Sequence, residues 1–577
     1  MADALKAYLY SPVPPSKEQK QRFENFLEGK YGRSVALEWQ KSEKDLNGFK
    51  LVCAGDVYDY TAPGRMRQFR EMLNSVRPED GNIIPLLKTA VEDWKPQAFS
   101  QEVGTVLSVG DGIAVVSGLP SAAYGEILLF EGETRGMVQN LAEKEVGCIL
   151  FDEDAEVRAG SSVYRTGRTA GIPVGDEFLG RTVNSLGMPI DGLGNIKADG
   201  YRPVESPAPG IIDRQSVSVP METGILSIDS MFPIGRGQRE LIIGDRQTGK
   251  TAIAVDTIIN QKGKNVICIY VSIGQKSSSV VQIAQTLKNR GAMDYTVIVH
   301  SGASESAPLQ YIAPYAGCTL GEYFMNKGKD VLIIYDDLSK HAIAYRTLSL
   351  LLGRAPGREA YPGDVFYLHS RLLERSAHLS DELGGGSITA LPIVETQAGD
   401  VSAYIPTNII SITDGQIFLE SSLFFEGQRP AVNVGLSVSR VGGDAQTRAM
   451  KKAAKTIRLD LSQYREMQVF TQFSSDLDDI TKRQLAYGQG LMRLLRQKQY
   501  ASYQMNEQVV LLTAALHHVM QNIPVGGIEE FAAKLLEHMH ANQEILMQRI
   551  AQTGELSDED EAVIISQAET LASETYA

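Results

Sequence analysis

The feature that most constrains the fold is the glycine-rich loop at residues 244–251, Gly-Asp-Arg-Gln-Thr-Gly-Lys-Thr. It has the spacing G-x-x-x-x-G-K-[ST]. A short apolar strand is expected before it at 240–243, and a helical pattern follows it at 252–259. In such a unit the backbone N–H groups and the helix N-terminus converge on a phosphate. The alternative, a glycine turn with a surface lysine, leaves the small residues at both ends of the loop unexplained.

We therefore predict a nucleoside triphosphate site at this loop. Lys250 is expected to reach the β/γ-phosphates, and the Thr251 hydroxyl is expected to ligate Mg²⁺. The predicted ATP-binding loop residues are Gly244, Asp245, Arg246, Gln247, Thr248, Gly249, Lys250 and Thr251.

Length and composition are those of a multidomain globular protein. At 577 residues the chain is expected to hold about four domains. No stretch approaches the roughly 20 apolar residues of a membrane span, and the N-terminus shows neither a signal nor a transit pattern. We expect a cytosolic or membrane-peripheral protein. The net charge of −14 argues against nonspecific nucleic-acid binding as its main task.

The cysteines and histidines form no metal-binding pattern in the sequence. Cys53, Cys148, Cys268 and Cys318 lie far apart and are expected to be buried free thiols. The histidines at 517–518, 538 and 540 are expected on the surface or in helix packing. The acidic run 557–561 predicts a solvated helix start or tail.

Periodicity predicts a multidomain α/β chain of five regions. Residues 1–75 form a small α/β unit, with a helix from the N-cap Ser16 to about Lys30 carrying Phe23, Phe26 and Leu27 on one face. Further elements of this front part are strands at 35–39 and 49–53, an arginine-rich helix at 64–73 and a connector helix at 83–94. The expected regions are 1–75, a helical connector at 76–100, a β-barrel at 101–168, a P-loop parallel-sheet nucleotide-binding domain at 169–445, and a C-terminal helical domain at 446–577.

Two of these regions rest on strand patterns. Short alternating strands with glycine turns recur about every ten residues and suggest a closed barrel. They are expected at 103–109, 112–117, 126–130, 136–141 and 146–150. Apolar strands that alternate with helices then predict a parallel sheet covered on both faces. Its strands are expected at 241–243, 266–271, 296–299 and 331–335, and helical runs at 509–520 and 529–539 mark the last domain.

The strand at 331–335 ends in two carboxylates. In P-loop proteins the acid at this position holds Mg²⁺, directly or through water. We assign that role to Asp336, the first acid after the apolar run, and expect Asp337 to cap the next helix.

Gln275 and Arg440 are the remaining candidates for phosphate chemistry. Gln275 follows a strand where a hydrolase needs a group to poise water. A glutamine can orient water but cannot accept its proton, and it is equally compatible with an ordinary polar helix start. Arg440 ends an apolar strand beside two glycines. Arginine presented in trans stabilises a transferring phosphoryl group, whereas the spacing alone favours a buried arginine paired with a carboxylate.

Several longer strings together resemble the α subunit of F-type ATP synthase. The resemblance runs from about Arg77 to about Arg549. Its motifs are the loop at 244–251, Pro314–Cys318, Ile334–Lys340, Pro356–Asp364, Ser376–Ser387, Glu395–Tyr404 and Ser437–Gly442.

The resemblance implies copies that alternate with β subunits in a hexameric ring around a γ stalk. It implies Mg-ATP held without hydrolysis, with Gln275 where the catalytic sibling has glutamate, and Arg440 reaching into the β site. Gln497 and Gln499 match adenine-side glutamines, and Arg429 and Phe424 match residues near the adenine pocket. The implied partners also include the δ and b peripheral-stalk subunits and, through the Fo sector, the cytoplasmic face of a bacterial membrane.

The front of the chain departs from this pattern, because an ordinary α subunit starts near Ile83. The preceding residues resemble the C-terminal half of the δ subunit in Pro15–Lys20, Leu46–Phe49, Gly55–Asp59 and Arg65. The helical bundle that normally precedes that half is absent from this sequence. The resemblance suggests that residues 1–75 help to attach the peripheral stalk.

Three other kinds of protein share parts of this pattern. A ring-shaped RNA translocase would need a basic, aromatic-bearing channel and an acidic catalytic residue, against which Gln275 and the net charge speak. A secretion or vacuolar-type rotary ATPase subunit would not carry Asp-Arg-Gln-Thr within the loop. A purely structural ring protein would not bind Mg-ATP.

Overall fold

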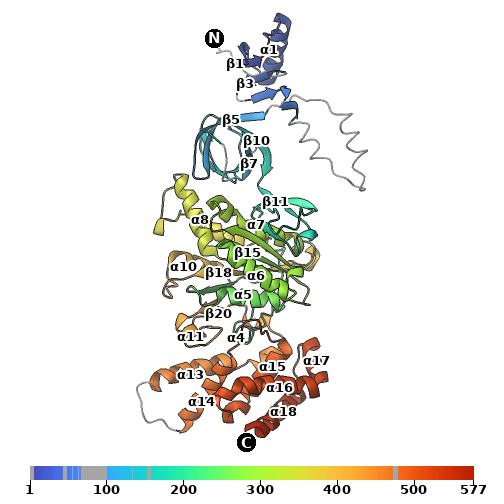
Figure 1. Ribbon diagram of the computed structural model, residues 1–577, viewed down its shortest axis with the longest axis vertical. Coiled ribbons are helices and arrows are strands. Elements are labelled where there is room, and N and C mark those ends of the chain that lie inside the picture. Colours follow the sequence, from blue (N-terminus) through green and yellow to red (C-terminus); the bar gives the residue numbers. More distant parts are fainter. Residues whose placement is uncertain are drawn as a thin grey trace. The chain divides into compact units, whose positions relative to one another are not determined.

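The computed structural model describes residues 5–42, 48–54, 56–62, 64–66, 101–132, 134–151, 157–471 and 479–576. The chain folds into two compact units, 1–170 and 171–577. The division falls close to the end of the expected barrel. Figure 1 shows the elements of each unit.

The first unit begins with a small α/β fold in which helix α1 (Lys17–Tyr31) packs on a sheet. Ser16 caps α1 by accepting a hydrogen bond from the N–H of Gln19, and the Gln19 side-chain oxygen in turn accepts one from the Ser16 N–H. Leu27 is buried, whereas Phe26 is 49% exposed. The expected helix is confirmed. The sheet strands are β1 (Leu5–Ser11), β2 (Val35–Lys41), β3 (Lys50–Cys53) and β4 (Asp56–Asp59).

The expected connector helix at 83–94 lies outside the described residues. Of the arginine-rich helix at 64–73, only residues 64–66 are described, and they are helical.

The described residues between 101 and 170 form the expected barrel. Its strand order is β10-β7-β8-β9-β6-β5, and β10 also pairs with β5, which closes the sheet on itself. Five strands match the predicted set, and β10 was missed because its sequence, SVYRTGRT, is mostly polar. The strands are β5 (Gln101–Gly110), β6 (Ile113–Ser117), β7 (Glu126–Phe130), β8 (Arg135–Leu141), β9 (Glu145–Leu150) and β10 (Ser162–Thr169).

The second unit is built on an eight-stranded sheet with the order β12-β16-β15-β17-β18-β14-β19-β20. All pairings are parallel except that of β20 with β19. Four of its strands were predicted as sheet strands, and the strand expected before Arg440 corresponds to β20, whereas β12, β18 and β19 were missed. The strands are β12 (Thr182–Asn184), β14 (Glu240–Gly244), β15 (Val266–Gln275), β16 (Thr296–Gly302), β17 (Asp330–Asp336), β18 (Ser387–Glu395), β19 (Gly415–Leu419) and β20 (Val438–Ser439).

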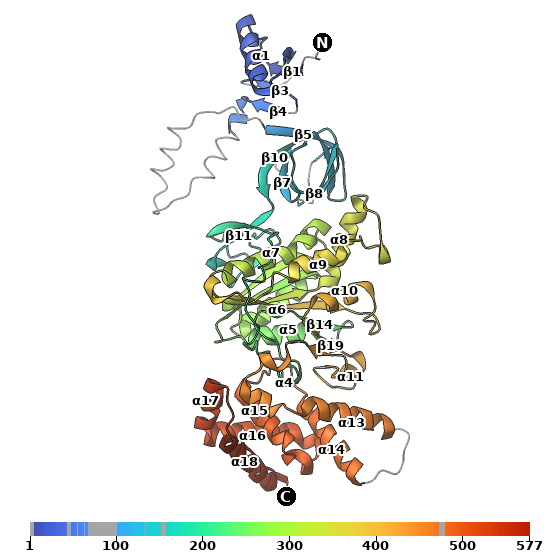
Figure 2. The same ribbon diagram turned by 180° about the vertical axis from the view of Figure 1, so that it is seen from behind.

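Helices cover both faces of this sheet, as its buried, continuously apolar strands require. Helices α5 and α6 lie on one face, and α7 and α8 lie on the other (Figures 1 and 2). Smaller elements complete the domain, including the strand pair β11 (Gly171–Val174) and β13 (Gly200–Pro203). The helices are α4 (Leu226–Met231), α5 (Lys250–Ile259), α6 (Ser277–Asn289), α7 (Ala307–Met325), α8 (Leu338–Leu351), α9 (Val365–Leu373), α10 (Tyr404–Ile412) and α11 (Ser421–Phe425).

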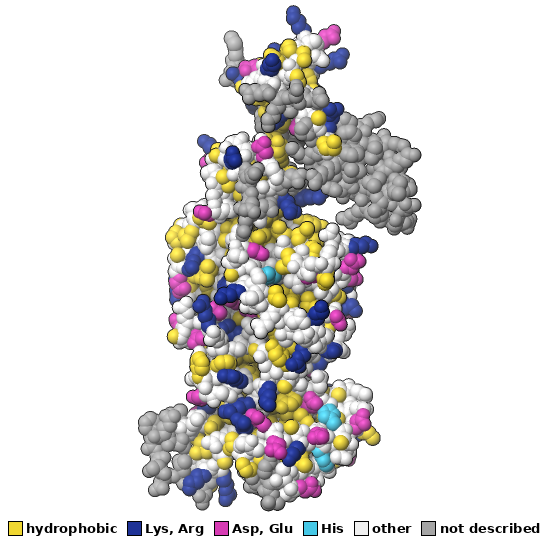
Figure 3. Space-filling model, in the orientation of Figure 1, with side chains coloured by type: hydrophobic (Ala, Val, Ile, Leu, Met, Phe, Trp, Pro, Cys, Tyr) yellow, Lys and Arg dark blue, Asp and Glu magenta, His cyan; other side chains and the backbone are white. Residues whose placement is uncertain are grey.

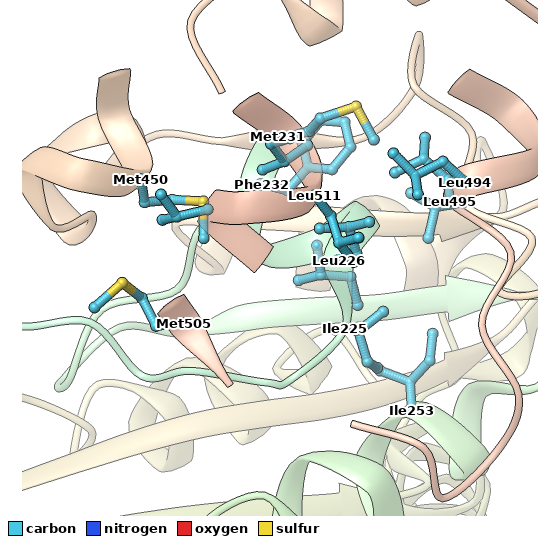
Figure 4. Packing of buried hydrophobic residues seen from close by; sticks show 14 of the residues in the cluster. Ile225, Leu226, Met231, Phe232, Ile253, Met450, Leu494, Leu495, Met505 and Leu511 are labelled. Carbon is cyan, nitrogen blue, oxygen red and sulfur yellow. The ribbon is translucent and has the colours of Figure 1, made fainter. Parts of the chain in front are cut away.

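The C-terminal part is helical, as predicted. Its core is continuous with that of the nucleotide-binding part, and Figure 4 shows Leu226 and Phe232 near Leu494, Leu495 and Leu511. The helices are α12 (Arg448–Ala453), α13 (Ile457–Thr471), α14 (Asp479–Leu494), α15 (Met505–Leu516), α16 (Ile528–Asn542), α17 (Glu544–Thr553) and α18 (Asp558–Tyr576).

Two details of this part differ from expectation. The helix expected at 509–520 spans 505–516, and it ends before His518, which has a left-handed φ of 62°. The acidic run opens α18 as expected, but Asp560 is not solvated, because it is buried and paired with Arg549.

Cysteine burial and surface charge complete the description. Cys53, Cys148, Cys268 and Cys318 are buried free thiols, which confirms the prediction. Basic and acidic side chains are interspersed on the face of residues 171–577 seen in Figure 3. Among the described residues, none of the helices has the length and apolar character that crossing a bilayer requires.

Candidate nucleotide site

The loop at 244–251 joins β14 to α5 with the geometry that its glycines require. A Cβ on Gly244 would lie 2.5 Å from the carbonyl oxygen of Leu419, so no side chain fits there. Gly249 precedes α5 with φ 96°, in the left-handed region that favours glycine. The loop therefore leads directly into the N-terminus of a helix, which is an anion-binding position.

Lys250 lies inside this loop. It is only 6% exposed, and its ammonium group donates to the Gly244 carbonyl at 2.9 Å and to the Asp245 carbonyl. Burial lowers the pKa of Lys250, while Glu395, Asp337 and Asp336 act to raise it. The ammonium group of Lys250 thus lies against the backbone of the loop, where a phosphate site needs a positive charge.

Thr251 and Asp336 meet although they lie far apart in the chain. The Thr251 hydroxyl donates to Oδ2 of Asp336 at 2.8 Å, and the Tyr270 hydroxyl donates to the same oxygen at 2.7 Å. A hydroxyl and a carboxylate oxygen are hard ligands of the kind Mg²⁺ takes beside phosphate oxygens. These residues therefore fit a magnesium ion next to the loop.

The neighbouring acid has another task. Asp337 is the N-cap of α8, and its carboxylate accepts a hydrogen bond of 2.8 Å from the N–H of Lys340. The expected helix cap is confirmed.

Gln275 also reaches the Asp336 region. It ends β15, and its amide nitrogen donates to the Asp336 carbonyl at 3.2 Å. Because β14, β15 and β17 are parallel, their carboxyl ends share one edge of the sheet, which brings the loop, Gln275 and Asp336 together.

Two other side chains of the loop, those of Asp245 and Arg246, bond to neighbouring segments of the chain. Asp245 accepts hydrogen bonds from Thr396, Gly399 and Ser421, at 2.7, 2.9 and 2.9 Å. Arg246 pairs with Glu395 at 3.1 Å. These side-chain contacts brace the loop against the rest of the chain. The bracing partners had no signal in the sequence, because they come from a different segment of the chain.

The residues expected on the adenine side gather near the start of α5. The Arg429 guanidinium lies 4.3 Å from the centre of the Phe424 ring, and that ring is 3.8 Å from the position of a Cβ on Gly249. The backbone N–H of Gln497 donates to the Arg429 carbonyl at 2.9 Å.

The two glutamines differ in their bonding. The Gln497 amide nitrogen donates to the carbonyls of Gly224 and Ala501, both at 2.7 Å, and its oxygen accepts from the N–H of Leu226 at 3.0 Å. The Gln499 side chain is exposed and forms no hydrogen bond with the described residues.

Arg440 lies at the other edge of the sheet. Ser439 pairs with Gly415, Gly415 pairs with Glu240 at the start of β14, and the Arg440 N–H donates to the Asp414 carbonyl at 2.9 Å. The loop follows the opposite end of β14. Arg440 is therefore separated from its own chain's phosphate loop by the length of that strand, about 13 Å.

Burial raises the pKa of the Glu240 carboxyl, and the charge of Arg440 acts to lower it. The Arg440 side chain is exposed, and its guanidinium forms no hydrogen bond or ion pair within the described residues. The buried, carboxylate-paired arginine that the spacing alone favoured is thus wrong.

Comparison with known proteins covers most of the chain. Residues 99–167 match the ATP synthase alpha/beta family beta-barrel domain. Residues 224–439 match the nucleotide-binding domain of that family, and residues 446–571 match its C-terminal domain.

Two curated relatives carry the description ATP synthase subunit alpha. One from Clostridium kluyveri (strain NBRC 12016) is 58% identical over 485 residues, which span 84% of this chain and 96% of the relative. One from Clostridium botulinum (strain Hall) is 57% identical over 485 residues, which again span 84% of this chain and 96% of the relative.

Proposed function

Since this chain belongs to the family of F-type ATP synthase α subunits, which form part of the F1 sector, we propose that its own site binds Mg-ATP without hydrolysing it and that Arg440 completes the catalytic site of a neighbouring β subunit. The observation that carries this proposal is the separation of the two groups. Lys250, Thr251, Asp336 and Gln275 meet at the carboxyl edge of the sheet, whereas the unpaired Arg440 lies at the amino edge.

At the chain's own site, each residue has a binding task. Lys250 and the N–H groups of the loop neutralise and hold the β/γ-phosphates. Thr251 and Asp336 hold Mg²⁺, which when bound neutralises phosphate charge and fixes its geometry. Arg429, Gln497, Gln499 and Phe424 form the adenine side.

Gln275 supports a site that binds ATP without hydrolysing it. It lies next to Asp336, where attacking water would have to be activated, and its amide has no basic group to take the water proton. The amide also donates to a backbone carbonyl, which fixes its orientation. The site can therefore retain a triphosphate.

Arg440 serves the neighbouring chain. A guanidinium presented to a γ-phosphoryl group stabilises the charge that develops during its transfer. The backbone of Arg440 is anchored to Asp414, whose carboxylate is in turn paired with Arg239 at 2.8 Å. A fixed backbone with a free side chain suits an arginine that acts in trans.

The proposed partners are those that membership of the family implies. We propose β subunits that alternate with copies of this chain in a ring, a γ stalk, the δ and b subunits of the peripheral stalk, and attachment through the Fo sector to the cytoplasmic face of a bacterial membrane. Residues 1–75 are proposed to help hold the peripheral stalk. The α/β fold of their described residues has a hydrophobic core of its own, and its strand β4 pairs with β5 of the barrel.

Nucleotide retention by the isolated chain tests the binding proposal. Lys250→Ala removes the charge that faces the β/γ-phosphates and is expected to abolish ATP binding in equilibrium dialysis. Lys262→Ala, an exposed lysine beyond the end of α5, is the matched control and should bind ATP like the wild type. Undiminished ATP binding by Lys250→Ala would refute the site.

A further inference from the structure

Helix α5 contacts the predicted adenine side as well as the phosphate loop. The Asp256 carboxylate, on α5, accepts a hydrogen bond of 3.0 Å from the backbone N–H of Tyr500. Tyr500 has a left-handed φ of 65°, which is uncommon for a residue with a side chain. The backbone turn that follows Gln499 is thus fixed by a carboxylate of the helix that begins at the phosphate loop.

Arg290 holds the same turn from the end of α6. Its guanidinium donates to the Tyr500 carbonyl at 3.3 Å and lies 4.9 Å from the centre of the Tyr500 ring. Burial raises the pKa of Asp256 to about 6, while the Tyr500 N–H and Arg290 act to lower it. The Asp256 carboxyl thus faces both a hydrogen-bond donor and a cation.

Gln497 completes the attachment of the turn. Its side-chain amide is engaged by Gly224, Ala501 and Leu226. Gln499, between Gln497 and Tyr500, keeps a side chain that is exposed and forms no bond with the described residues. The turn is thus anchored on both sides of Gln499, whose amide is free to bind a ligand.

We propose that Asp256 is a positioning residue for recognition of the nucleobase. Helix α5 holds the phosphate end through Lys250 and Thr251 and the base end through Asp256, about 9 Å further along the same helix. A single rigid element then sets the distance between the triphosphate site and the amide of Gln499. The inference rests on the proposed ATP site and adds a residue that determines base specificity.

The test compares ligands that share the triphosphate but differ in the base. In the isolated chain, Asp256→Ala is expected to weaken ATP binding about tenfold, the effect of losing one hydrogen bond to a charged group. The ratio of ATP to GTP affinity should fall with it, and the affinity for inorganic tripolyphosphate should stay unchanged. Asp256→Asn keeps an acceptor oxygen for the Tyr500 N–H and should restore most of the discrimination.

Two further variants sharpen the result. Asp294→Ala removes an exposed aspartate after α6 and should leave all three affinities unchanged. Gln499→Ala should cause the same loss of discrimination as Asp256→Ala, and the double variant should lose little more, because both act through one contact.

The outcomes separate this inference from the proposed function. Equal losses of ATP and tripolyphosphate binding in Asp256→Ala, or no loss at all, would overturn the positioning role. If Lys250→Ala still binds ATP, the ATP site itself is wrong. If Lys250→Ala fails to bind and Asp256→Ala discriminates like the wild type, only the role of Asp256 fails.

Discussion

The Thr251 hydroxyl donates a hydrogen bond of 2.8 Å to the Asp336 carboxylate across a separation of 85 residues. This contact joins the end of the phosphate loop to the end of β17. It places two oxygen ligands side by side where a magnesium ion would bridge to the nucleotide phosphates.

Removing either oxygen should uncouple nucleotide binding from magnesium. Thr251→Val and Asp336→Asn are each expected to reduce the gain in ATP affinity that Mg²⁺ provides in the isolated chain. Thr251→Ser retains the hydroxyl and is the matched control. Titrations of ATP with and without Mg²⁺ measure the gain, and a wild-type gain in Thr251→Val would contradict the ligand assignment.

The isolated chain should keep its ATP intact. Gln275 provides no base that could take a proton from water. Arg440 lies at the opposite edge of the sheet, so it does not serve the chain's own site. We therefore expect bound ATP to be recovered unhydrolysed after long incubation, as measured by chromatography of the released nucleotide. Stoichiometric conversion to ADP by protein free of β subunits would contradict the noncatalytic role.

The raised pKa of Asp256 predicts a pH-dependent stability. The pKa rises from an ordinary 3.8 to about 6 in the folded chain because the carboxyl is buried. The folded state therefore binds the proton more tightly than the unfolded state. This contribution to stability is complete below pH 3.8 and is lost as the pH rises through about 6.

Asp256→Asn removes this titration. Relative to the variant, the wild type should lose stability as the pH is raised from 4 to 7, by at most about 3 kcal/mol. Thermal unfolding of both proteins across this pH range measures the difference. A difference that stays constant with pH would show that Asp256 has an ordinary pKa.

Much of this site could be predicted because its signals are local. The loop spacing alone indicated Lys250 and Thr251, and an apolar strand that ends in an acid indicated Asp336. The helix cap at Ser16 was also local, since it depends on Gln19 three residues later. Such features need no knowledge of tertiary contacts.

The missed features depend on contacts between distant segments. The Asp245 carboxylate bonds to Thr396 and Ser421, more than 150 residues along the chain, and no local pattern indicates these partners. Strand β18 was missed because it contains Pro392 and small residues within a buried run. Strand β19 has only five residues, too few for a clear period.

Residues 2–75 should be dispensable for ATP hydrolysis but not for coupling hydrolysis to ion transport. Deleting residues 2–75 leaves the phosphate loop and Arg440 in place, so the assembled F1 ring is expected to keep most of its ATPase rate. Tethering through the chain raises the effective concentration of a docking unit. The truncated enzyme should therefore retain less of the δ and b subunits and pump ions less efficiently per ATP. Full stalk content with tight coupling would exclude the stalk role.

The ATPase rate of a ring that contains Arg440→Ala tests the central claim most directly. The variant should assemble with β subunits and bind ATP at its own site, because Arg440 lies at the opposite edge of the sheet from the loop. Loss of an arginine that acts in trans lowers turnover by about 10³–10⁵. We predict a loss of this size in steady-state hydrolysis with unchanged ATP content in the noncatalytic sites. Wild-type turnover of the purified Arg440→Ala ring would contradict the account.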